Sequence, residues 1–250
     1  MKIKGYEFGT GKPVVCVPVV ERTEQAIIEK IRQMTESKVP MIEWRMDWYE
    51  KVDDVCTVKA LLEKIAPYVE NTVLLCTFRS KAQGGEATLD ASAYMELNRV
   101  AAASGVPDMI DLEFYEVTQQ KDTIEELQKS GVYVVCSNHN FTYTPQLDVM
   151  EGQLTEMVTA GADFAKLAVM PRNKKDVLCL LEAVLSVREK HPDKHFIAMA
   201  MGQDGMISRL IGEWYGSEVT FAAFGKTSAP GQAAYEQVQE ILERIEECGR

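Results

Sequence analysis

The sequence lacks the features of disulfide-stapled, zinc-binding and membrane-spanning proteins. Its six cysteines all stand more than 15 residues apart, and none forms a Cys-x-x-Cys pair. We therefore expect buried free thiols and no zinc site. No run reaches the ~18 apolar residues needed to span a bilayer, and residues 1–13 contain no apolar signal-peptide segment. These absences predict a cytoplasmic protein without a membrane anchor.

Basic residues are in the minority. Lys and Arg number 27 against 38 Asp and Glu, which gives a formal net charge of -11 over 250 residues. Such a charge repels polyanions, so nucleic acid is not an expected partner, although local basic side chains can still bind a small anion. The hydrophobic fraction of 46% is ordinary for a globular protein, and no linker interrupts the chain. We expect one domain over residues 1–250.

Apolar, strand-like runs alternate with longer helical patterns, and the runs recur about every thirty residues. The expected strands are Pro13–Val20, Met41–Trp48, Thr72–Arg79, Met109–Phe114, Val132–His139, Phe164–Met170, His195–Met201 and Val219–Phe224. The expected helices are Thr23–Thr35, 57–67, 91–104, 121–130, 147–160, Lys175–Arg188, 207–214 and 232–247.

Eight such βα units predict a (β/α)8 TIM barrel, in which active sites form at the carboxyl ends of the strands. The alternative is an open doubly wound sheet. That fold normally has a glycine-rich turn after its first strand, whereas Val20 is followed by Glu21, Arg22 and Thr23. We favour the barrel, with residues 1–12 forming a short hairpin over one of its ends.

Charged residues interrupt the apolar pattern near the ends of two early strands. Glu43, Arg45 and Asp47 alternate with apolar residues and therefore share one face, which in a barrel points inward. A solvated strand or a self-satisfied ion pair is the simpler alternative. Arg79 ends the third expected strand, just before a polar loop. We interpret these charges as candidate binding residues.

A lysine and a histidine on later strands suggest chemistry. Lys166 stands third in an apolar run, where burial without a partner favours the neutral amine that imine-forming lysines need. Alternatively, it reaches the surface or pairs with an inward acid such as Asp111 or Glu113. His139 is the one histidine of three that lies at the carboxyl end of an expected strand, and imidazole suits proton transfer near neutral pH.

Two further features follow the last strands. We expect Arg209 to begin a helix, where its charge and the helix N-terminus could together hold a carboxylate. Residues Gly225–Gln232 are small and precede the final helix. Such a loop can act as a lid, although most loops of this composition are only turns.

Taken together, these strand ends resemble the type I 3-dehydroquinate dehydratase family, and the resemblance runs from Pro13 to the final helix. Each matching segment is weakly specific, but their common order is highly specific. The matching segments are Glu43-Trp44-Arg45 with Asp47, Phe78-Arg79-Ser80, Gly84-Gly85-Glu86, Met109-Ile110-Asp111-Leu112-Glu113, Ser137-Asn138-His139, Lys166-Leu167-Ala168-Val169-Met170-Pro171, Ser208-Arg209 and Ser228-Ala229-Pro230-Gly231-Gln232.

The resemblance implies a (β/α)8 barrel, usually a homodimer, that converts 3-dehydroquinate to 3-dehydroshikimate in the shikimate pathway without metal or cofactor. Lys166 resembles the imine-forming lysine, and His139 resembles the general acid/base. The residues that resemble substrate hydroxyl, carboxylate, clamp and lid contacts are Glu43, Arg45, Arg79, Arg209, Ser228 and Gln232.

Two residues depart from the family pattern. Gln83 replaces a glutamate that orients the histidine, so His139 keeps a hydrogen-bond partner but loses a negative charge, and we expect it to titrate at a lower pH. Asn140 replaces an aspartate. Glu86 matches a noncatalytic glutamate but is a second candidate for orienting His139. An aldolase-like imine enzyme and a noncatalytic protein that binds a carbocyclic acid remain alternative functions.

Overall fold

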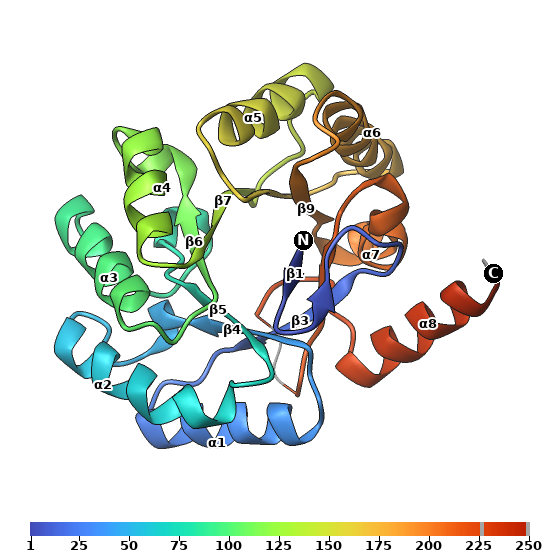
Figure 1. The fold of residues 1–250 in the computed structure, drawn as a ribbon. Helices are drawn as coiled ribbons and strands as arrows, with labels where there is room; N and C mark the ends of the chain where they lie inside the picture. Colours follow the sequence, from blue (N-terminus) through green and yellow to red (C-terminus); the bar gives the residue numbers. More distant parts are fainter. Residues whose placement is uncertain (226–227, 249–250) are drawn as a thin grey trace.

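A ring of parallel strands forms the centre of the protein in a computed structural model that describes residues 1–225 and 228–248 (Figure 1). Every neighbouring pair in the order β10-β3-β4-β5-β6-β7-β8-β9 is parallel. A bridge between Phe196 and Ser217 closes the ring. The strands are β3 (Val14–Val19), β4 (Met41–Arg45), β5 (Val73–Thr77), β6 (Met109–Glu113), β7 (Tyr133–Asn140), β8 (Phe164–Val169), β9 (His195–Ala200) and β10 (Val219–Phe221).

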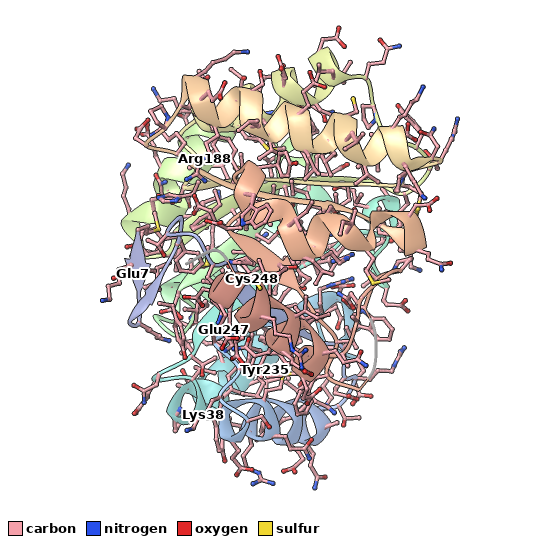
Figure 2. The ribbon with its side chains drawn as sticks, turned by 90° about the vertical axis from the view of Figure 1, so that its right-hand side faces the viewer. Glu7, Lys38, Arg188, Tyr235, Glu247 and Cys248 are labelled. Atoms are coloured by element: carbon pink, nitrogen blue, oxygen red, sulfur yellow. The ribbon has the colours of Figure 1, made fainter. Side chains whose placement is uncertain are left out.

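Helices surround this ring, and the expected TIM-barrel fold is confirmed. The helices are α1 (Glu24–Glu36), α2 (Val55–Ile65), α3 (Ala91–Ala103), α4 (Gln120–Lys129), α5 (Leu147–Thr159), α6 (Lys174–Lys190), α7 (Gly202–Ile211) and α8 (Tyr235–Cys248). Figure 2 shows Tyr235 of α8 near Lys38, which follows α1, and the Tyr235 hydroxyl donates to the Lys38 carbonyl at 3.4 Å. The last helix thus meets the first.

Local sequence explains where several helices begin. Thr23 accepts a hydrogen bond from the first turn of α1, and Asp54 and Asp90 cap α2 and α3 in the same way. Such caps satisfy backbone N–H groups that have no partner within the helix. In α1, Ile27 and Ile31 repeat at helical spacing and are fully buried against the ring.

The barrel lumen is apolar at one end and polar at the other. Alternate residues of β5 show the change: Val73 and Leu75 belong to the apolar lumen cluster, and Thr77 hydrogen-bonds to Glu43. The same change occurs along β8, where Phe164 is followed by Lys166. Because all strands are parallel, the polar residues gather at their carboxyl ends.

A short hairpin covers the apolar end of the lumen, as the sequence predicted. Its strands are β1 (Lys2–Ile3) and β2 (Tyr6–Glu7). Ile3 and the following Phe8 are buried in the lumen cluster, and the Phe8 ring meets that of Phe164 edge-on at 5.4 Å between centroids. The hairpin therefore closes the end of the barrel opposite the polar side chains.

Several expected elements were wrong in their bounds by three residues or more, among them the strand expected over Val219–Phe224, which ends at Phe221. The expected strand over Met41–Trp48 ends at Arg45, and Met46–Trp48 forms the 3-10 helix η1. The expected helix over 207–214 instead begins at Gly202 and ends at Ile211. Gly205 disguised this start, because a Cβ there would lie 2.3 Å from the Ala200 carbonyl oxygen. Gly205 is therefore explained by the close packing of α7 against the end of β9, and it does not interrupt the helix.

The cysteines follow the expectation only in part. Cys16, Cys76 and Cys136 are buried free thiols, whereas Cys56 and Cys248 are exposed. Burial raises the pKa of the Cys16 thiol well above its usual value, which keeps it protonated inside the lumen. Across residues 1–225 and 228–248, no helix combines the length and apolar character needed to cross a bilayer.

Candidate active site

A cleft at the carboxyl ends of the strands brings the expected site residues together. Its empty space, including the open mouth, is about 470 Å³. All the predicted catalytic and binding residues line it, together with Gln83. The lining residues are Glu43, Arg45, Arg79, Gln83, Gly84, His139, Phe141, Lys166, Ala168, Met199, Met201, Arg209, Phe221, Ser228, Ala229 and Gln232.

Lys166 projects from the middle of β8 into a set of charges. Its Nζ donates to Asp111 Oδ2 at 2.9 Å and lies 3.7 Å from Glu43 Oε1. It also lies 4.9 Å from the centroid of the Phe221 ring. The expectation of an amine without a charged partner is therefore wrong, and pairing with an inward acid is confirmed. The barrel buries this amine together with the carboxylate that compensates its charge.

Asp111 stands at the centre of this network. Besides Lys166, it accepts from Arg79 Nη2 at 2.7 Å and from Ser137 Oγ at 2.6 Å. Burial raises the pKa of the Asp111 carboxyl, but the positive charges of Arg79 and Lys166 outweigh it and hold that pKa below its usual range. Asp111 is thus a carboxylate at neutral and mildly acidic pH. The sequence offered it only as one of two possible partners for the lysine.

The arginines at the ends of β4 and β5 already have acidic partners. Arg79 also donates from Nη1 to Glu113 Oε1 at 2.8 Å. Arg45 makes two hydrogen bonds of 2.8 Å to Asp47, one from Nε and one from Nη2. Asp47 in turn accepts the backbone N–H of Arg79 at 3.2 Å. Both guanidinium groups line the cleft, but most of their charge is matched within the protein.

His139 lies against Gln83, which ends the 3-10 helix η3 (Lys81–Gln83). Gln83 Oε1 accepts the His139 backbone N–H at 2.9 Å and lies 3.2 Å from His139 Nδ1. Because the backbone N–H can only donate, the amide oxygen must face His139, and Nδ1 then carries the ring proton. The lone pair of Nε2 remains available as a base.

The surroundings of His139 favour the neutral ring. Burial lowers the pKa of His139 well below its usual value, and the positive charges of Arg79 and Lys166 lower it further. Asp111 acts in the opposite direction but does not cancel these effects. Burial and nearby positive charges thus lower the pKa of His139, in addition to the missing negative charge at Gln83.

Glu86 and Asn140 do not supply a charge to His139. Glu86 is exposed, and its backbone N–H donates to Asp47 Oδ2 at 3.0 Å. Asn140 Oδ1 accepts the backbone N–H of Thr142 at 2.9 Å, so its side chain shapes the turn after β7. Of the two candidates for orienting His139, the structure brings Gln83 into contact with the ring.

Arg209 is buried near the cleft without an acidic partner among the described ion pairs. Its Nη atoms contact the carbonyl oxygens of Phe221 at 3.5 Å and Pro230 at 3.4 Å, and its buried Nε has no hydrogen-bond partner among the described residues. Burial lowers the pKa of Arg209 to about 10. A charged group in this state needs an anion. The expectation that Arg209 begins a helix is wrong, because it lies in the last turn of α7.

The loop before α8 forms the wall next to Arg209. Ser228 and Gln232 bind each other, with the Ser228 backbone N–H donating to Gln232 Oε1 at 2.9 Å. The backbone N–H of Gly202 donates to the Pro230 carbonyl at 3.2 Å. Lys226 and Thr227 of the expected lid loop lie outside the described residues.

Aromatic and sulfur-containing side chains complete the walls. Phe141, Met199 and Met201 line the cleft, and sequence analysis did not identify them. Apolar residues at strand ends give no signal that separates a cleft wall from the core. Within the described part of the chain, no group of three or more His, Cys, Asp or Glu residues is placed to hold a metal ion.

The chain matches one family model and many proteins of known name. The family model described as type I 3-dehydroquinase matches residues 15–248. A 3-dehydroquinate dehydratase of Clostridium kluyveri is 39% identical, with 98% of this chain and 97% of the relative covered. A 3-dehydroquinate dehydratase of Bacillus licheniformis is 40% identical, with 97% and 96% covered.

Solved structures agree with these matches. The type I 3-dehydroquinate dehydratase of Clostridium difficile, solved with covalently modified comenic acid, superposes with a TM-score of 0.93 at 35% identity, covering 99% of this chain and 98% of that one. The 3-dehydroquinate dehydratase of Geobacillus kaustophilus gives a TM-score of 0.95 at 30% identity, covering 100% and 97%. From its cleft, its barrel and these full-length matches, we conclude that the chain belongs to the type I 3-dehydroquinase family.

Proposed function

We propose that this protein dehydrates 3-dehydroquinate to 3-dehydroshikimate through an imine on Lys166, with His139 as the general acid and base. One observation carries the proposal. Lys166 and His139 come from neighbouring strands, where Ser137 of β7 pairs with Lys166 of β8, and both side chains line the same cleft. A buried amine beside an imidazole with a free Nε2 is the pairing that this reaction requires.

Arg209 anchors the substrate in this proposal. The substrate carries a carboxylate, and Arg209 is the buried cation of the cleft that lacks an acidic partner among the described ion pairs. Ser228 and Gln232, which line the same wall, supply further hydrogen-bond donors. Holding the carboxylate there fixes the ring relative to the strand ends, where Glu43 and Arg45 are placed to contact its hydroxyl groups.

The chemistry then proceeds at the ketone. The Lys166 nitrogen forms a bond to the ketone carbon, the carbon–oxygen bond breaks, and water leaves. The resulting protonated imine draws electrons from the neighbouring carbon, so His139 Nε2 can remove a proton from it. The electron pair then expels the hydroxyl group one carbon further on, and the proton held by His139 leaves with it as water. Hydrolysis of the imine releases the product and restores the amine.

The Clostridium difficile relative supports a covalent step, since that enzyme was solved with a covalently modified ligand. The aldolase-like alternative finds less support here. A sugar phosphate needs a site for a doubly charged group, whereas Arg209 is a single buried cation without an acidic partner among the described ion pairs, which matches one carboxylate better. Activity on a panel of sugar phosphates, with none on 3-dehydroquinate, would favour the alternative.

Borohydride reduction tests the proposal directly. Treating the protein with 3-dehydroquinate and borohydride should add the mass of the reduced adduct to Lys166, identified by peptide mass spectrometry. Lys166→Ala should show neither the adduct nor growth of the enone absorbance. Turnover without any adduct on Lys166 would overturn the imine mechanism. Tight binding without turnover by the unaltered protein would instead indicate the noncatalytic alternative.

We also infer that the protein forms a homodimer. Large apolar side chains are exposed along α6, α7 and the 3-10 helix η5 (Gly212–Tyr215), with Leu178 63% and Trp214 66% exposed. Exposed apolar surface of this kind commonly marks an interface. Sedimentation equilibrium should give twice the chain mass, and Trp214→Glu should lower it. A monomer at micromolar concentration would contradict the inference.

A further inference from the structure

We propose that Asp111 is the counter-ion of the Lys166 nitrogen throughout the reaction, so that it acts on the imine as well as on the free lysine. This inference rests on the proposed imine mechanism and adds a residue to it. Asp111 does not line the open cleft but lies directly beneath it, with its Oδ2 at 2.9 Å from the Lys166 nitrogen. It thus touches the atom that forms the bond to substrate.

The charge on that nitrogen explains why a permanent counter-ion suits the site. Overall, an ammonium group and a ketone give a protonated imine and one water, so the positive charge is present before and after condensation. A carboxylate that remains ionised therefore stabilises both states without exchanging a proton. Removing it would leave a buried positive charge uncompensated at each stage.

Two neighbours keep Asp111 in its charged form and in position. Arg79 Nη2 and Ser137 Oγ both donate to Oδ1, at 2.7 Å and 2.6 Å, which leaves Oδ2 for the lysine. One carboxylate oxygen of Asp111 therefore contacts the lysine, while hydrogen bonds to the other oxygen hold the side chain in position. Arg79 is accordingly a positioning residue for Asp111, in addition to its place in the cleft wall.

Glu43 is the competing counter-ion, and the geometry disfavours it. Its Oε1 lies 3.7 Å from the lysine nitrogen and accepts from Thr77 Oγ1 at 2.9 Å. At that separation it adds to the local charge but makes no direct hydrogen bond to the amine. The structure therefore assigns the direct contact to Asp111.

The test measures how fast borohydride traps Lys166 with saturating 3-dehydroquinate in three proteins. These are the unaltered enzyme, Asp111→Asn, and Glu113→Gln as the matched control. Glu113 is also a buried carboxylate of β6 bound to Arg79, but none of the described ion pairs joins it to Lys166. We expect Asp111→Asn to lower the trapping rate and kcat by roughly 100-fold. KM should change less than about threefold, because Arg209 can still bind the substrate carboxylate. We expect Glu113→Gln to trap within about threefold of the unaltered enzyme.

The outcomes separate this proposal from the mechanism on which it rests. Failure to trap the unaltered enzyme would overturn the imine mechanism itself. Trapping of the unaltered enzyme together with equally fast trapping of Asp111→Asn would overturn the counter-ion role alone. Equal slowing in Asp111→Asn and Glu113→Gln would also overturn it, because loss of Arg79 support would then explain both.

A second variant covers the case in which Asp111→Asn does not fold. Ser137→Ala removes the 2.6 Å hydrogen bond to Asp111 and leaves every charge in place. It should slow trapping by roughly threefold to tenfold while its thermal unfolding remains cooperative. Trapping at the unaltered rate in Ser137→Ala would contradict the proposal.

Discussion

Arg209 combines a cost to the fold with the binding role that we propose for it. Its guanidinium is almost fully buried, and its contacts are neutral carbonyl oxygens, a methionine sulfur and no carboxylate among the described ion pairs. A buried charge in that state destabilises the empty protein. The arrival of an anion removes that destabilisation, which strengthens binding.

Replacing Arg209 should therefore separate stability from affinity. We expect Arg209→Met to raise KM for 3-dehydroquinate by at least ~100-fold, because the carboxylate loses its buried partner. The same variant should melt a few degrees higher than the parent, by roughly 2–4 °C for each kcal/mol gained. Steady-state kinetics and calorimetry of the two proteins measure both effects. A variant that binds weakly and also melts lower would show that Arg209 supports the fold.

If His139 acts as the proposed base, we expect Gln83 to influence the pH range over which it can do so. The pKa of His139 lies well below 6.5, so the ring stays neutral at pH values somewhat below 6.5. We therefore expect the acid limb of the kcat/KM profile to lie below pH 6.5. Gln83→Glu places a negative charge beside Nδ1, which stabilises the imidazolium. The acid limb should then move to higher pH by about 1 unit or more. Measuring kcat/KM from about pH 4 to about pH 9 would show the shift. This range extends roughly two units to either side of the usual pKa of histidine.

Glu86→Gln is the control for this experiment. Glu86 is exposed, so removing its charge should leave the acid limb in place. A shift of the acid limb to lower pH in Glu86→Gln, comparable in size to the upward shift in Gln83→Glu, would instead indicate that Glu86 orients His139.

At this scale the sequence identified residues that line the cleft but not their charge pairs. Lys166 and His139 could be selected as candidates because each is an unusual residue type for its position in a strand. The role of Asp111 could not, because its partners Lys166 and Arg79 lie 55 and 32 positions away in the chain. Only the closed ring of strands brings such residues into contact.

The segment between β5 and α3, residues 78–90, has two roles at the cleft. It presents Gln83 to the histidine, and it turns sharply at Gly84, whose φ is +85°. A Cβ on Gly84 would lie 2.3 Å from the ring of Phe141, which lines the cleft. The glycine is thus needed both for the turn and for the cleft wall.

A matched pair of glycines tests this double role. Gly105 also has positive φ, at +69°, but a Cβ on Gly105 would meet no other atom within 4 Å. Both Gly84→Ala and Gly105→Ala should lose about 1 kcal/mol of unfolding free energy through backbone strain. Only Gly84→Ala should also lower kcat/KM, by at least ~10-fold, because Phe141 and Gln83 must move. Equal kcat/KM in the two variants would contradict the role of the loop in the site.

Element types were predictable, whereas several ends were not. The apolar runs identify every barrel strand because each is buried on both faces. The end of β4 at Arg45 was not predictable, since alternation continues to Asp47 while the chain has already turned into η1. The start of α7 was hidden because Gly202 and Gly205 serve a turn and close packing rather than ending a helix.

The whole molecule separates the end of the barrel that the hairpin closes from the end that carries the candidate active site. The hairpin and Phe8 fill one opening, and the cleft occupies the other. In barrels of this kind, residues at the amino ends of the strands contribute stability while the opposite ends carry activity. Substitutions at the two ends should therefore have different consequences.

Phe8→Ala tests that separation. Removing a buried aromatic ring should cost about 3–5 kcal/mol of unfolding free energy. The kcat of the folded fraction should remain within about twofold, because the charged groups of the cleft lie at the opposite end of the barrel. Denaturant unfolding and kinetics at low temperature measure the two quantities. A large fall in kcat without loss of stability would show that packing around Phe8 affects the cleft.

The pairing of charges at the strand ends has one more consequence, for the approach of the substrate. At the carboxyl ends of the strands, four buried acids balance four buried bases, so the net charge of -11 comes from the remaining residues; the acids are Glu43, Asp47, Asp111 and Glu113, and the bases are Arg45, Arg79, Lys166 and Arg209. An anionic substrate that approaches the protein is therefore repelled by the negative charge of the remaining residues, whereas the buried charges at the strand ends sum to zero. Added salt screens the outer field over about 10 Å at roughly 0.1 M, so the encounter rate should rise with ionic strength.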